Sequence, residues 1–269
     1  ISKMTKSELL CLMSGGMATI AGGVLAAYIG YLGGEDAAGK LFFAKHLITA
    51  SVLSAPAAIM SAKILIPETE KFDEVAEISK QSMGSNALDA ISNGTTQGVK
   101  LAVNVGAMLL VFVALVYGVN YIIIHTLGDW TGLNTWTSNV TNGQFDAFSL
   151  EFILGAVFSP LAWILGVPAS DIMLVGQLLG EKTVLNEFYS YVSLTEMKEK
   201  GLFSSERSVI LSTYMLCGFA NISSIGIQIG GIGVLAPSRR KELSELGIKA
   251  LIAGTAASLF TAAYVGMII

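Results

Sequence analysis

Long apolar stretches alternate with polar connections along most of this chain. A helix needs about 20 predominantly apolar residues to cross the hydrocarbon core of a bilayer. Five stretches reach that length, at residues 9–32, 46–67, 101–124, 208–236 and 246–269. The pattern therefore predicts an all-α membrane protein in which these stretches form transmembrane helices.

A sixth apolar stretch, residues 150–191, is interrupted by proline, glycine and charged side chains, among them Pro160, Asp171 and Lys182. No part of this stretch is a clean span. Two helices that enter and leave the bilayer on the same side fit such a pattern. We therefore predict a re-entrant hairpin over residues 149–205.

Two long connections set the expected orientation. Residues 68–100 mix charged and apolar positions, as in EKFDEVAEISKQ, which predicts a helix lying at the membrane interface over residues 68–99. Residues 125–149 contain no lysine or arginine, so this connection is expected to face outward. Threading the spans then places the basic cluster at Arg239 inside and the C-terminus outside. The basic residues near Lys198 would also lie outside, which opposes this orientation.

The spans and connections divide the chain into five expected segments. They are a broken helix with the following span (1–67), the interfacial helix (68–99), a scaffold helix with an outer loop (100–148), the re-entrant hairpin (149–205), and a second broken helix with the last span (206–269).

Two short segments of the chain repeat one pattern. GMATIAG at residues 16–22 and GFANISS at residues 218–224 share glycine, a large apolar residue, alanine, a polar residue, isoleucine and two small residues. The predicted topology runs them in opposite directions through the membrane. Opposed copies are typical of inverted-repeat transporters, whose substrate and ion sites lie at discontinuous helices near the bilayer midplane.

Glycine, serine and asparagine at these two places weaken a helix by about 0.5–1 kcal/mol each relative to alanine. An unwound turn exposes carbonyl oxygens, which suit an alkali cation and are tolerated in lipid only where they line a site. The alternative is close helix packing through small residues. Because both copies occur in opposed orientation, we predict two broken helices that form a site.

Four polar side chains stand out within apolar surroundings. A carboxylate inside a membrane is costly and points to function, so Glu187 is expected to hold vicinal hydroxyls, as on a ribose, or to carry a coupling proton. It could instead lie at the interface or pair with Lys182. Asn221 and Ser224 are three residues apart and share one side of a helix, where they suit a polyol. The hydroxyl of Thr19 suits a cation or a ligand.

Composition agrees with lipid as the solvent. Of 269 residues, 53% are hydrophobic and 13% charged, and the mean hydropathy is +0.65. Soluble domains carry about 25% charged residues. No basic stripe with interleaved aromatic residues indicates nucleic acid, and no nucleophile or metal motif indicates an enzyme. Residues 34–40 fit the start of a phosphate loop, but Leu41 stands where serine or threonine must hold magnesium.

Several motifs together resemble one family, the concentrative nucleoside transporters. They are MTKSEL (4–9), GGMATIAGGVLAAYI (15–29), SAPAAIMSAKILIPETEK (54–71), KTVLNEF (182–188), LCGFANISSIGI (216–227) and LAPSRRKEL (235–243). They are similar, in order, to the C-terminal half of such a transporter. The resemblance implies a homotrimer whose protomers each move a transport domain against a scaffold, with two re-entrant hairpins and two broken helices around the site.

The resemblance also implies roles for individual residues. Glu187, Asn221 and Ser224 would hold the ribose, Phe219 would border the sugar, and Val24 would contact the base.

For the ion, the resemblance implies that Thr19 and Ile20 supply part of a sodium site. The family's first hairpin, with the base-reading residues and the rest of the ion site, is expected to precede Ile1 in a longer protein. The chain would then hold the ribose half of the substrate site and half of the ion site.

We therefore expect sodium-coupled symport of nucleosides such as uridine into the cell, across the cell membrane, with no cofactor besides the coupling ion. The expected partners are nucleoside, membrane lipid and two further copies of the protein. Proton coupling and a non-transporting, nucleoside-binding membrane fragment are the alternatives.

Overall fold

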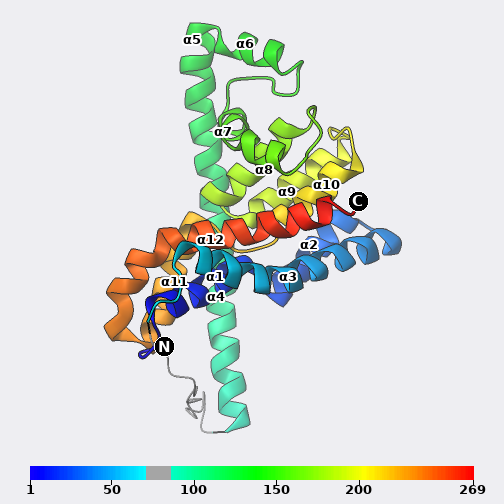
Figure 1. Cartoon of the computed structure of the whole chain (residues 1–269). Coiled ribbons are helices and arrows are strands. Elements are labelled where there is room, and N and C mark those ends of the chain that lie inside the picture. Colours follow the sequence, from blue (N-terminus) through cyan, green and yellow to red (C-terminus); the bar gives the residue numbers. More distant parts are fainter. Residues whose placement is uncertain (71–85) are drawn as a thin grey trace.

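The structure, a computed structural model, describes residues 1–70 and 86–269, and helices dominate this part (Figure 1). No strand occurs in it. The α-helices are α1 Lys6–Ala18, α2 Gly22–Gly33, α3 Ala37–Leu65, α4 Ala87–Ile122, α5 Asp129–Thr131, α6 Leu133–Val140, α7 Leu150–Ile164, α8 Ile172–Val184, α9 Glu187–Glu199, α10 Glu206–Leu216, α11 Ile222–Leu235 and α12 Arg240–Gly266. A π-helical turn, η1 Ile123–Gly128, and a 3-10 turn, η2 Pro237–Arg239, complete them.

Helices α1, α3 and α12 pack side by side, and α10 and α11 pack against α12 (Figure 1). Their shared core includes Met13 and Met17 of α1 and Leu246 and Ala250 of α12, all fully or nearly fully buried. Burial of such apolar surface is the main force that holds helices together in this core. The long helix α4 runs past the other helices and extends beyond them at its N-terminal end.

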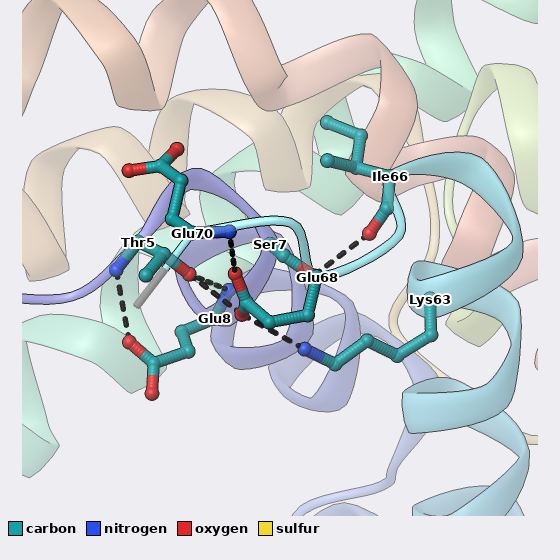
Figure 2. Close-up of polar contacts among 7 residues, drawn as sticks. All are labelled: Thr5, Ser7, Glu8, Lys63, Ile66, Glu68 and Glu70. Atoms are coloured by element: carbon teal, nitrogen blue, oxygen red, sulfur yellow. Dashed lines mark hydrogen bonds and ion pairs between the residues drawn. The ribbon is translucent and has the colours of Figure 1, made fainter. Parts of the chain in front are cut away.

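Hydrogen bonds tie the start of α1 to the end of α3 (Figure 2). The Thr5 hydroxyl donates to the Glu68 carboxylate over 2.8 Å, and Lys63 Nζ donates to the same oxygen over 3.1 Å. The Ser7 hydroxyl donates to the carbonyl oxygen of Ile66 over 2.7 Å. The chain therefore leaves α3 at a fixed position beside the N-terminal end of α1.

Within the described residues, three helical stretches are long and apolar enough to cross a membrane, judged by length and composition. They are Lys6–Gly33, Ala37–Leu65 and Pro237–Gly266. They correspond to the first, second and last predicted spans. The span predicted at residues 208–236 is divided into α10 and α11, and neither half has the length of a full span.

The second span begins earlier than predicted. The sequence places its start at residue 46, whereas α3 starts at Ala37. The physical reason is a helix cap, since the Asp36 carboxylate accepts hydrogen bonds from the backbone nitrogens of Ala38 and Gly39. Most of the connection between the first two predicted spans, residues 33–45, is therefore helix.

The predicted interfacial helix falls partly outside the described residues, because 71–85 are not described. Its last part, from Ala87 onward, belongs to α4, which continues for 36 residues to Ile122. The expected boundary between residues 99 and 100 is therefore wrong. No proline interrupts this stretch, and Asn86 caps its start by accepting from the backbone nitrogen of Asp89.

The region predicted as a two-helix hairpin contains three helices. Gly166, with φ +76°, follows α7, and the chain passes Pro168 before α8 begins. α7 and α8 approach closely, because a Cβ on Gly176 would lie 2.5 Å from the carbonyl oxygen of Gly155. α8 and α9 are joined by a short turn and form a helical hairpin. Its turn, at Leu185, directly precedes the helix that begins with Glu187.

Candidate functional site

Two helix interruptions meet in the middle of the fold. One separates Ala18 at the end of α1 from Gly22 at the start of α2, and the other separates Leu216 of α10 from Ile222 of α11. Gly218 lies between the latter pair with φ +133°. A Cβ there would lie 2.9 Å from the carbonyl oxygen of Ala18, so only glycine permits this approach of the two backbones.

Asn221 organises the second interruption. As the N-cap of α11, its Oδ1 accepts hydrogen bonds from the backbone nitrogen of Ser224 over 2.9 Å and from the Ser224 hydroxyl over 2.9 Å. The Ser223 hydroxyl donates to the same oxygen over 2.6 Å. The Nδ2 group of Asn221 is left to reach across to another element, and it donates to Glu187 Oε2 over 3.1 Å.

Glu187 is the first residue of α9, and 5% of it is exposed. Its second oxygen, Oε1, accepts a hydrogen bond from the Tyr28 hydroxyl over 3.3 Å. Burying a carboxylate is costly unless hydrogen bonds compensate it. One donor for each oxygen provides part of that compensation and leaves further lone pairs for a ligand. The structure thus joins Glu187, Asn221 and Ser224, all three expected from the sequence, in one buried hydrogen-bonded cluster.

Tyr28 is a member of this cluster that sequence reasoning missed. It is fully buried and stacks on Tyr191 with 4.0 Å between ring centroids. The available signal was its spacing, since Tyr28 follows Val24 by four residues and therefore lies on the same face of α2. Val24 and Ile20 are half-buried and pack against the same hydrophobic cluster as Tyr28.

Lys182 is fully buried on α8, five residues before Glu187. Its Nζ donates to the carbonyl oxygen of Met215 over 2.8 Å and to the Ser258 hydroxyl over 2.9 Å. These bonds link α8 to the end of α10 and to α12. Lys182 is therefore not the hydrogen-bond partner of Glu187, because its hydrogen bonds go to Met215 and Ser258.

Thr19 lies in the first interruption, directly after α1. Its hydroxyl donates to the carbonyl oxygen of Gly15 over 3.1 Å, so its oxygen lone pairs remain available to a cation. Phe219 is half-buried in the second interruption. Among the described residues, no group of three or more histidine, cysteine and acidic side chains is placed to hold a metal ion. The atoms that could bind a cation at this interruption are therefore hydroxyl and carbonyl oxygens.

Comparison with known proteins identifies the family. A family model described as "Na+ dependent nucleoside transporter C-terminus" matches residues 46–266. The chain belongs to this sodium-dependent nucleoside transporter family. The resemblance read from the sequence motifs is thereby confirmed, as is the expectation that the chain is not an enzyme, since its relatives in this family are transporters.

Individual members of the nucleoside transporter family match over the whole chain. An uncharacterized transporter of Haemophilus influenzae is 39% identical over 100% of this chain and 60% of its own length. Rat sodium/nucleoside cotransporter 1 is 37% identical over 100% of this chain and 40% of its own length. The chain thus spans less than two thirds of these relatives.

A solved structure of CNTnw in an inward-facing substrate-bound state matches with 38% identity and a TM-score of 0.83. The match covers 99% of this chain and 58% of the CNTnw chain. The fold described above is therefore that of a nucleoside transporter of the concentrative type, and the chain is a membrane protein.

Proposed function

We propose that this chain forms part of a secondary active transporter that moves nucleosides, uridine among them, into the cell together with a cation. The observation that carries the proposal is the buried cluster of Glu187, Asn221 and Ser224 beside the two helix interruptions. The names of the relatives, a sodium/nucleoside cotransporter among them, support the same substrate class.

The chemistry of the cluster suits a ribose. Two vicinal hydroxyls can donate to the free lone pairs of the Glu187 carboxylate, and the amide of Asn221 and hydroxyl of Ser224 can exchange hydrogen bonds with the same sugar. Phe219 borders the sugar and Val24 the base in this proposal. The groups that read the base are proposed to belong to the part of the complete transporter that this chain does not cover.

Sodium is the proposed coupling ion. The hydroxyl of Thr19 and the backbone carbonyls around Ile20 supply part of its site, and hard oxygen ligands of this kind suit an alkali cation. A bound cation shifts the transporter toward a state with higher nucleoside affinity only if it binds that state more tightly. A proton coupled through Glu187 is the alternative.

The complete transporter is proposed to be a homotrimer in the plasma membrane, surrounded by lipid. Each protomer would move a transport domain, built on an inverted repeat that includes the hairpin α8–α9 and both interruptions, against a scaffold that includes α4. The C-terminus would face outward.

Uptake of radiolabelled uridine by cells expressing the complete transporter tests the proposal. Uptake should require sodium and be lost when choline replaces it. Uptake that persists in choline and rises at low external pH would show that the coupling ion is a proton and not sodium. Uridine binding to the purified protein without any uptake would instead identify a non-transporting binding protein.

A further inference from the structure

A second polar pocket lies away from the Glu187 cluster. Its volume is about 450 Å³, and it lies between α4 and the start of α7 on one side and the hairpin α8–α9 on the other. Four acidic side chains line it, namely Asp146, Glu151, Glu181 and Glu196. Lys200 is the one basic residue of this described lining, and it pairs with exposed Glu196 over 3.5 Å at the outer end.

Glu181 is the innermost of these carboxylates, with 1% of the residue exposed. Its Oε1 accepts a hydrogen bond from Gln177 Nε2 over 2.7 Å. The Ser193 hydroxyl also hydrogen-bonds to the carboxyl group, and Oε2 is the oxygen left without a hydrogen-bond partner among the described residues. An ionised carboxylate buried in this way is costly unless a positive charge or a proton neutralises it.

Among the residues that the structure describes, the groups around Glu181 do not supply that charge. Glu151, facing it from α7, is also acidic, and both of its oxygens accept from Asn120 Nδ2 over 2.9 and 2.8 Å. Tyr189 faces it from α9 and carries no positive charge. Lys182, the next residue in the chain, directs its Nζ to Met215 and Ser258 instead.

We propose that this pocket is a second cation site, in which Glu181 is the innermost ligand of a single positive charge. The charge is a sodium ion that keeps part of its water shell, or a proton. The pocket has room for such waters, since each takes about 30 Å³. Divalent ions such as calcium prefer six to eight oxygen ligands, and no dense carboxylate cluster of that kind occurs in the described chain.

The position of the pocket gives the charge a consequence for the hairpin. Glu181 lies on α8 and Glu196 on α9, so a cation between them draws together the two helices whose turn leads into Glu187. The coupling role of this cation rests on the proposed function, because a cation can be a coupling ion only in a transporter. Cation binding itself needs no nucleoside.

The test measures the melting temperature of the purified complete transporter without nucleoside. In one titration, sodium chloride replaces choline chloride at constant ionic strength. In the other, pH is varied in choline chloride alone. The variants are Glu181→Gln, which keeps the shape of the side chain, and Glu199→Gln, an exposed carboxylate of α9 outside the pocket.

Glu181→Gln should raise the half-saturating cation concentration at least about tenfold, which corresponds to about 1.4 kcal/mol. Glu199→Gln should titrate like the wild type. If Glu181→Gln weakens the response of the melting temperature to sodium, the bound charge is a sodium ion. If it weakens the response to pH, the bound charge is a proton. The Thr19→Ala variant weakens the other proposed sodium site. The rise in melting temperature with sodium that remains in this variant should be lost when Glu181→Gln is added.

Glu196→Gln, at the exposed end of the pocket, serves as a second variant that is safe for folding, and it should weaken the same response by a smaller factor. Glu181→Gln and Glu196→Gln curves that superimpose on the wild type in both titrations would overturn the proposal. Failure of uridine uptake in the wild type would overturn the proposed function but would leave these nucleoside-free titrations interpretable.

Discussion

The side-chain amide of Asn221 donates a hydrogen bond of 3.1 Å to the carboxylate of Glu187, although 34 positions separate the two residues. Asn221 is the N-cap of α11, and Glu187 is the first residue of α9. Helix N-termini favour negative charge and hydrogen-bond acceptors. The pair therefore places a carboxylate where two helix ends converge, and it joins the hairpin to the second helix interruption.

Replacing Asn221 by serine separates its two roles. Serine caps a helix about as well as asparagine, but it cannot reach Glu187 with an amide donor. A hydrogen bond to a charged group contributes about 1.5–3 kcal/mol. With the cap kept, the free energy of unfolding should therefore fall only by about the value of this one bond, while uridine affinity, measured by calorimetry on the complete transporter, should fall at least about tenfold. Unchanged affinity would show that the pair does not shape the substrate site.

Tyr28→Phe removes the hydroxyl that donates to Glu187 and keeps the ring that stacks on Tyr191. In a double-mutant cycle with Glu187→Gln, the two changes should be non-additive by about 0.5–3 kcal/mol in unfolding free energy, as for residues in direct contact. Tyr31→Phe, on the exposed side of α2, is the matched control. Additive effects of Tyr28→Phe and Glu187→Gln would contradict the contact.

The sequence predicts the main residues of this site but not every residue that forms hydrogen bonds with them. Glu187 and the interruption at Asn221 were found because a charge and helix-weakening residues in apolar stretches are local signals. Tyr28 was missed because its spacing from Val24 indicates only a shared helix face, whereas its hydrogen-bond partner lies 159 positions away. The start of α3 was missed because Asp36, a helix cap, lies among small residues that also suit a loop.

Gly218→Ala should prevent correct folding. The residue has φ +133°, and the added Cβ would lie 2.9 Å from the carbonyl oxygen of Ala18, so neither conformation nor space permits it. Gly230→Ala, within α11 and with open space around it, is the control and should stabilise the protein by about 0.4–1 kcal/mol. Yield of monodisperse protein and melting temperature measure both. A normally folded Gly218→Ala protein would contradict the close approach of the two interruptions.

The contact between α1 and α3 predicts a pH dependence. The Thr5 hydroxyl, followed by Lys63, lowers the pKa of Glu68 below its ordinary value. A depressed carboxyl pKa stabilises the fold above the unfolded pKa of about 4.3, and this contribution is lost as pH falls through the folded pKa. The melting-temperature difference between wild type and Glu68→Gln should shrink correspondingly in acid. A difference that stays constant with pH would contradict this role.

Glu187 is proposed to hold the sugar of a transported nucleoside. Uridine uptake by cells expressing the complete transporter tests it most directly, with Glu187→Gln compared with Glu199→Gln at equal amounts of protein in the membrane. Glu187→Gln should reduce uptake to background, because an NH2 donor replaces one of the two acceptor oxygens and the negative charge is lost. Glu199→Gln should leave uptake unchanged. Uptake by Glu187→Gln close to that of the wild type would contradict the claim.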